Sequence, residues 1–311
     1  MPTFLHMIKY FIDASKINTM KNIFIFLRKK FSLISLLLVC LVNISGCANT
    51  QIKNDPIKKH IQKQVSFGPR IPGSDASLKT VIYFKDYLEG QGWIVEFQEF
   101  DFDGVKLRNV IARNSANPPE LLIGTHYDTR QFSDQDPVKS NQTLPVPGAI
   151  DGSSGSALLL ELGNLIAKEE KSILLVFFDG EDQGRINDWQ WSIGAEYFAK
   201  NLVEKPDRVV ILDMLGDTDL KFFKELNSDL ELSAEIWTIA GNLGFSSSFI
   251  NERKHSFIDD HLPFINLGIP TVLLIDFDYP FWHTTSDTLD KVSERNLEIV
   301  LEVIVEWIKS N

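Results

Sequence analysis

The most regular feature of the chain is an alternation of short apolar runs with longer segments of helical periodicity. A continuous apolar run at residues 173–178 is typical of a strand buried on both faces. The mostly apolar segments 208–212 and 271–275 predict further strands, and a short strand is predicted at 120–124. Apolar positions with helical spacing occur at 75–91, 155–168, 195–202, 230–243 and 293–308. This alternation predicts a three-layer α/β fold, with a mostly parallel central sheet and helices on both faces.

A predicted hairpin precedes the parallel part of the sheet. Residues 93–100 and 105–112 alternate between apolar and polar side chains and are joined by Asp103-Gly104, a pair typical of two-residue turns. This pattern adds an antiparallel edge to the sheet. No linker interrupts the later pattern, so we expect residues 64–311 to form one catalytic domain.

The first 46 residues have the features of an export signal. A basic region that ends in Arg28-Lys29-Lys30 precedes an apolar run at residues 31–44, which is shorter than the about 20 residues that a membrane span needs. An uncleaved anchor helix remains the alternative. Translation could start at Met1 or at Met20, and the second start would give a signal of more usual length.

The end of this signal suggests how the protein is attached. Ile44-Ser45-Gly46-Cys47 resembles the bacterial lipobox, which implies cleavage before Cys47 and a lipid on that cysteine. We therefore expect an exported protein, periplasmic or membrane-anchored, which touches the membrane only through this lipid. The polar residues 47–63 would form a tether that turns into a first helix.

Composition and charge narrow the chemistry. The chain has 311 residues, is 44% hydrophobic and carries a formal net charge of -11, which argues against nucleic acid as a partner. Its two cysteines are Cys40 and Cys47, inside the signal and at its end. The body therefore has no thiol, and any metal must be held by His, Asp and Glu. We expect a monomer.

Polar clusters follow the apolar runs, where an α/β sheet binds its ligands. They are His126-Tyr127-Asp128, Asp151-Gly152-Ser153, Asp179-Gly180-Glu181-Asp182, Asp213-Met214, Asp259-Asp260-His261 and Trp282-His283-Thr284. Each alone can be explained by a helix cap or a hydrogen-bonded histidine. Together they supply the His and carboxylate ligands of a zinc site with an open position. The neighbouring Glu181 and Asp182 favour one carboxylate on a cation and one that transfers protons.

The order of these clusters, over roughly residues 65–308, is similar to the M28 family of zinc aminopeptidases and their relatives. The resemblance implies a zinc exopeptidase-like fold in which Glu181 is the general base. It implies a zinc site formed by Asp151, Asp182 and His283. It also implies a possible second zinc site completed by His126 and Asp213.

Three details resemble the glutaminyl cyclase branch of that family rather than its peptidases. They are Trp282 before the last histidine, the segment 259–264 with its paired aspartates, and the insertion 185–192 with Trp189 and Trp191. This branch closes an N-terminal glutamine of a peptide into pyroglutamate and releases ammonia. One departure is Asp182, where the animal enzymes carry a second glutamate; a shorter ligand bears on zinc affinity.

The same resemblance implies further roles. Asp259, hydrogen-bonded with Asp213, would hold the reaction intermediate, and Trp282, with Trp189 or Trp191, would contact the substrate. One zinc ion is expected for a cyclase. The alternatives are a two-zinc aminopeptidase and a metal-free binding protein, and zinc content per chain separates the first two.

Overall fold

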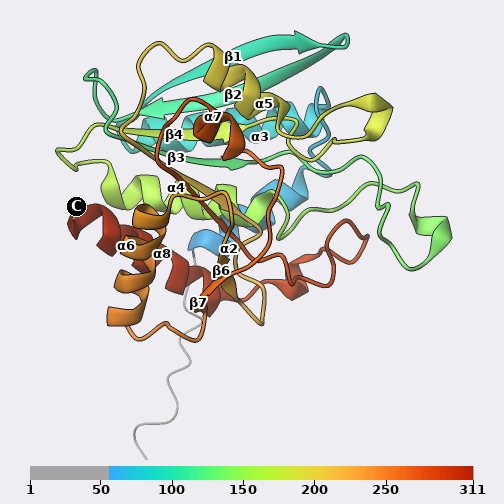
Figure 1. Cartoon of the computed structure of the whole chain (residues 1–311). Coiled ribbons are helices and arrows are strands. Elements are labelled where there is room, and N and C mark those ends of the chain that lie inside the picture. Colours follow the sequence, from blue (N-terminus) through green and yellow to red (C-terminus); the bar gives the residue numbers. More distant parts are fainter. Residues whose placement is uncertain (1–55, 311) are drawn as a thin grey trace, which may run out of the picture. The chain divides into compact units, whose positions relative to one another are not determined.

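A six-stranded mixed sheet forms the centre of residues 56–310, the part of the chain that the computed structural model describes (Figure 1). The predicted export signal at 1–46 and the proposed lipid site lie outside these residues. The strands are β1 (Ile94–Phe102), β2 (Val105–Arg113), β3 (Leu121–His126), β4 (Ile173–Phe178), β5 (Arg208–Asp213) and β8 (Thr271–Ile275). Their order is β1-β2-β4-β3-β5-β8, and the last four strands in this order are mutually parallel.

Helices cover both faces of this sheet. Helices α5 (Ile193–Lys200) and α7 (Leu262–Asn266) lie on one face, whereas α4 (Ser153–Ile166), α6 (Leu230–Asn242) and α8 (Glu294–Ser310) lie on the other (Figure 1). Helix α4 is buried along almost its whole length, because α2 (Pro56–Ser66), α3 (Asp75–Gly90) and α8 also pack against it. The predicted three-layer α/β fold is confirmed.

The edge hairpin forms as predicted. Strands β1 and β2 pair in an antiparallel register that ends at Phe102 and Val105. The two turn residues, Asp103 and Gly104, have positive φ values of 49° and 79°. This is the left-handed geometry that two-residue hairpin turns require.

Two parts of the fold add to the sequence pattern. Helix α2 begins at Pro56, inside the segment 47–63 that we expected to turn from a tether into a first helix. Ile57 and Ile61, one turn apart, are buried against the core. A separate two-stranded sheet, β6 (Phe222–Lys224) and β7 (Phe249–Arg253), was not predicted. Its strands have three and five residues, too short for a periodic signal.

Three 3₁₀ turns complete the elements in residues 56–310: η1 (Lys139–Asn141), η2 (Ile186–Asp188) and η3 (Leu289–Lys291). In this part of the chain no helix is both long and apolar enough to cross a membrane.

Candidate active site

The carboxyl ends of the parallel strands bring the predicted polar clusters together. His126 is the last residue of β3 and Asp213 the last residue of β5, while Glu181 and Asp182 lie just after β4. Because these strands are neighbours and point the same way, their ends deliver side chains to one edge of the sheet.

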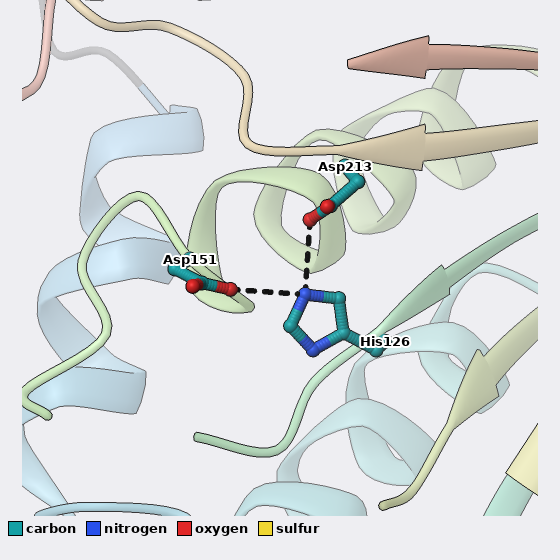
Figure 2. Close-up of side chains that lie close together, drawn as sticks. All are labelled: His126, Asp151 and Asp213. Atoms are coloured by element: carbon teal, nitrogen blue, oxygen red, sulfur yellow. Dashed lines mark hydrogen bonds and ion pairs between the residues drawn. The ribbon is translucent and has the colours of Figure 1, made fainter. Parts of the chain in front are cut away.

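One group of side chains surrounds His126 (Figure 2). Its Nε2 lies 2.9 Å from Oδ1 of Asp213 and 3.2 Å from Oδ1 of Asp151, which lies in the loop before α4. All three residues are buried, and each offers one donor atom to a common point. These are the residues for which the family resemblance implies a second zinc site.

A second group shares Asp151. Nε2 of His283 lies 2.8 Å from Oδ1 of Asp182 and 3.8 Å from Oδ2 of Asp151. In each group the possible ligand atoms lie within 4.8 Å of one another. The structure therefore brings together all five predicted ligands, with Asp151 common to both groups.

Two further aspartates fix the backbone of these ligands. Asp128 accepts hydrogen bonds from the amides of Glu181 and Asp182, at 3.0 and 3.2 Å. Asp287 accepts from the amides of Ile150 and Asp151, at 2.9 and 3.1 Å. The sequence assigned no role to either residue. Asp128 stands in a recognised cluster, but nothing near Asp287 in the sequence indicates its function.

The burial of so many carboxylates shifts their titration. Burial and then the charge of Asp259 raise the pKa of Glu181 well above its usual value. The pKa of Asp259 is raised to about 7 by burial and by Asp213, and that of Asp182 to about 6 by burial and by Asp151. A general base with a raised pKa can hold a proton near neutral pH and release it again.

The pKa values of the two histidines are also raised, but by neighbouring carboxylates and against the effect of burial. Burial lowers the pKa of His283, but Asp182 and Asp134 outweigh it and raise the value to about 9. The pKa of His126 is likewise raised, because Asp213 and its neighbouring carboxylates outweigh burial. The two histidines share the compensation of the local negative charge with Arg130, whose Nη1 lies 3.9 Å from Oδ1 of Asp182.

A cavity of about 210 Å³ opens onto these groups. Its walls include Trp191 and Trp282, together with Ile258, and the acids Glu181 and Asp259 lie on its surface. Two of the three predicted tryptophans therefore line the cavity.

The third predicted tryptophan does not face this cavity. Trp189 packs edge-on against Phe102, with ring centroids 5.1 Å apart, and lines a separate depression near Ile71 and Pro72. Of the two alternatives, Trp189 and Trp191, only Trp191 lines the cavity beside Glu181. The left-handed residues Asn187 and Asp188 turn the loop so that Trp191, rather than Trp189, faces the cavity.

The expected hydrogen bond between Asp259 and Asp213 is also not observed in residues 56–310. Asp213 lies against His126, whereas Asp259 accepts a bond of 2.5 Å from the amide of Asp260. His261 is fully buried, with Nε2 3.4 Å from Oε2 of Glu225.

The fold is a mostly parallel α/β sheet, and two buried His–carboxylate groups that share Asp151 lie near its strand ends. This combination defines the class as a zinc exopeptidase-like α/β protein. Residues 109–308 match Peptidase family M28. The chain belongs to this family, and the resemblance inferred from the sequence is confirmed.

Individual relatives are similar over most of the chain. The glutaminyl-peptide cyclotransferase of Gloydius blomhoffii is 28% identical over 288 residues, which cover 76% of each chain. The crystal structure of Tannerella forsythia glutaminyl cyclase matches with a TM-score of 0.78 and 30% identity, covering 83% of this chain and 98% of that one. A leucine aminopeptidase precursor from Bacteroides thetaiotaomicron matches with a TM-score of 0.79 and 29% identity, covering 83% and 97%.

Proposed function

We propose that this protein is a zinc-dependent glutaminyl-peptide cyclotransferase, an acyltransferase that acts on peptides with an N-terminal glutamine. The observation that carries the proposal is a small tryptophan-walled cavity whose surface holds Glu181 and Asp259 beside a His–carboxylate group. A single glutamine side chain fits this combination, because the nucleophile and the electrophile belong to one residue and only orientation and proton transfer are needed. The cyclotransferase and glutaminyl cyclase relatives support the same activity.

The ligand residues fit a zinc ion. Oδ2 of Asp151 and Oδ2 of Asp182 are buried and accept no hydrogen bond in the described part of the chain. A buried carboxylate oxygen without a donor is costly, and a cation would remove that cost. Asp151, Asp182 and His283 would hold the ion. When bound, zinc supplies Lewis-acid polarisation of the side-chain amide carbonyl.

Glu181 would act as the proton carrier. The α-amino nitrogen of the substrate attacks the side-chain amide carbon, a carbon–nitrogen bond forms in the ring, and the bond to the amide nitrogen breaks. Glu181 accepts the proton that the amine loses and delivers it to the departing ammonia. Ser192 Oγ, 3.3 Å from Oε1 of Glu181, can orient this carboxylate.

Asp259 and Asp213 would stabilise the arrangement around Glu181. Asp259 lies on the cavity surface, and its pKa of about 7 allows it to donate a hydrogen bond as a neutral acid. Trp282 and Trp191 would contact the aliphatic part of the glutamine side chain. Trp189 is left out of this proposal because it lines another depression.

A two-zinc aminopeptidase is the second candidate. The group formed by His126, Asp151 and Asp213 is complete and buried, so a second ion has ligands available. The similarity to the leucine aminopeptidase precursor favours the same alternative. About one zinc per chain would support the cyclase and about two the aminopeptidase.

An assay of the purified protein on two substrates tests the choice. Gln-β-naphthylamide should give pyroglutamyl product and ammonia, and both Glu181→Gln and a chelator should abolish the reaction. Leu-p-nitroanilide should remain uncleaved. Release of nitroaniline with glutamine left uncyclised would instead establish an aminopeptidase.

We further propose that the enzyme is an exported lipoprotein, periplasmic or membrane-anchored, and that its catalytic domain is monomeric. The basic and apolar pattern of residues 1–46 and the lipobox-like end at Cys47 support this location. Membrane fractionation of the parent and of Cys47→Ala, with light scattering of the purified protein, tests both statements. Equal membrane association of the two proteins would rule out the lipid anchor.

A further inference from the structure

The loop after β3 places a buried arginine beside the active site. Arg130 is 3% exposed, and its Nη1 donates a hydrogen bond of 2.9 Å to the carbonyl of Asp182. Its Nη2 donates to the carbonyl of Gly184 at 3.2 Å and to Oδ2 of Asp134 at 2.6 Å. One planar guanidinium group thus fixes the backbone of a predicted metal ligand and of the loop that follows it.

The same arginine supports one wall of the cavity. Its Cζ lies 5.0 Å from the ring of Trp191, within the range of a cation–π contact. The Trp191 ring is nearly parallel to the His283 ring, with centroids 6.1 Å apart and an angle of 20° between the ring planes. Arg130 therefore contacts both Asp182, a predicted metal ligand, and Trp191, a wall of the cavity.

Asp134 extends this arrangement to the other side of His283. Its Oδ1 lies 3.3 Å from Nδ1 of that ring, while Nε2 of the ring faces Asp182 at 2.8 Å. A carboxylate on the second nitrogen fixes the orientation of a ligating imidazole and raises its basicity.

We propose that Arg130 and Asp134 form a positioning pair that orients His283 as a metal ligand and holds Trp191 against the substrate. Asp134 would act on the imidazole, and Arg130 would act on both Asp182 and the tryptophan. The inference rests on the proposed function for the identity of metal and substrate.

Beyond its contacts with Arg130 and His283, the Asp134 side chain contributes little to the packing of the fold. Its side chain is 39% exposed, so its carboxylate is not needed to fill the core. Other groups anchor this loop beside His283: the amide of Gln135 donates to the carbonyl of His283 at 3.2 Å, and Asp136 accepts hydrogen bonds from the amide and the hydroxyl of Thr285, at 3.0 and 2.6 Å. Within residues 56–310 the Asp136 carboxylate forms no hydrogen bond or ion pair with His283, so Asp136 offers a matched control on the same loop.

The test compares Asp134→Asn, Arg130→Lys and Asp136→Asn. Each purified protein is stripped of metal and titrated with Zn²⁺ against a chromogenic chelator, and kcat and KM for Gln-β-naphthylamide are measured at saturating zinc. Asp134→Asn should weaken zinc binding by about 10- to 100-fold, with KM within about twofold of the parent. Arg130→Lys should weaken zinc binding and also raise KM, since lysine lacks the planar fork and the stacking surface.

Two controls separate orientation from folding. Asp136→Asn should lower Tm yet leave zinc affinity and KM within about twofold, and Asp134→Glu should recover most of the zinc affinity. The proposal is overturned if Asp134→Asn binds zinc like the parent, or if Asp136→Asn loses as much affinity. The zinc titration requires no turnover, so failure of the cyclase assay in the parent protein would be recognised separately.

Discussion

Trp282 lies flat against the ring of its neighbour His283, with centroids 3.6 Å apart and planes inclined by 24°. The backbone of His283 is left-handed, with φ of 55°, a conformation that costs energy in a residue other than glycine. The indole therefore has two functions: it is a wall of the cavity, and it supports a strained predicted ligand.

Removal of this indole should affect substrate binding most. We expect Trp282→Ala to raise KM for Gln-β-naphthylamide by about 10-fold, because stacked aromatic contacts and lost apolar burial together cost about 1–2 kcal/mol. Trp189→Ala, which removes an indole from outside the cavity, should leave KM within about twofold. Steady-state kinetics at saturating zinc measure both. Equal effects of the two substitutions would contradict the assignment of Trp282 to the cavity wall.

Gly184 should tolerate no side chain, because Trp191 covers it. A Cβ at this position would lie 2.1 Å from Cδ2 of the Trp191 ring. Gly184→Ala should therefore displace the indole and raise KM several-fold. Gly90→Ala is the matched control, since a Cβ at Gly90 meets no heavy atom within 4 Å. A KM for Gly184→Ala equal to that of the control would mean that the Trp191 wall is not used by the substrate.

Arg70 should be essential for stability rather than for chemistry. Its side chain is fully buried and donates to the carbonyls of Tyr127, Pro147 and Gly148, at 3.2, 2.8 and 2.7 Å. Arg70→Met would leave these acceptors without donors, and we expect a loss of about 3 kcal/mol or more in the free energy of unfolding. Urea unfolding measures it, and the exposed Arg295→Met serves as the control. A loss below about 1 kcal/mol would show that water replaces the guanidinium.

His60 should make stability depend on pH. Burial lowers the pKa of its imidazole to about 4, and Nδ1 lies 2.5 Å from the hydroxyl of Tyr83. Because the folded value lies below the unfolded value of about 6.5, the stabilisation is complete above pH 6.5 and is lost as the pH falls towards 4. The total change is at most about 3 kcal/mol.

A variant that lacks only the His60 imidazole isolates this contribution. The difference in unfolding free energy between the parent and His60→Gln should shrink by about 2 kcal/mol between pH 7.5 and pH 4.5. Urea titrations at the two pH values provide the comparison. A difference that stays constant across this range would mean that the His60 pKa is the same in the folded and the unfolded protein.

The elements whose bounds were predicted best are the strands whose residues are buried along almost their whole length. Strands β4 and β8 match the predicted ranges 173–178 and 271–275, because a strand covered on both faces needs an unbroken apolar run. The site residues at the strand ends could be predicted for the same reason. Once the strands are located, the position of Glu181 and Asp182 at the ligand-binding edge follows from the fold class.

The residues that the sequence did not predict act over long separations. Asp287 holds Asp151 across 136 positions, and no local pattern marks an aspartate that binds a distant backbone amide. The choice between Trp189 and Trp191 depended on left-handed residues within an irregular loop, which periodicity does not describe. Helix α2 was assigned partly to a tether because most of its side chains are polar and only one narrow face is buried.

Because both histidine groups share Asp151, substitutions of the individual ligand residues have unequal effects on the two groups. Loss of His126 or of His283 removes a donor from one group, whereas loss of Asp151 removes a donor from both at once. Replacement of His126 therefore leaves all three donors of the His283 group in place, and replacement of His283 leaves those of the His126 group. Asp151 is the one position of the two groups at which a substitution cannot change one group and spare the other.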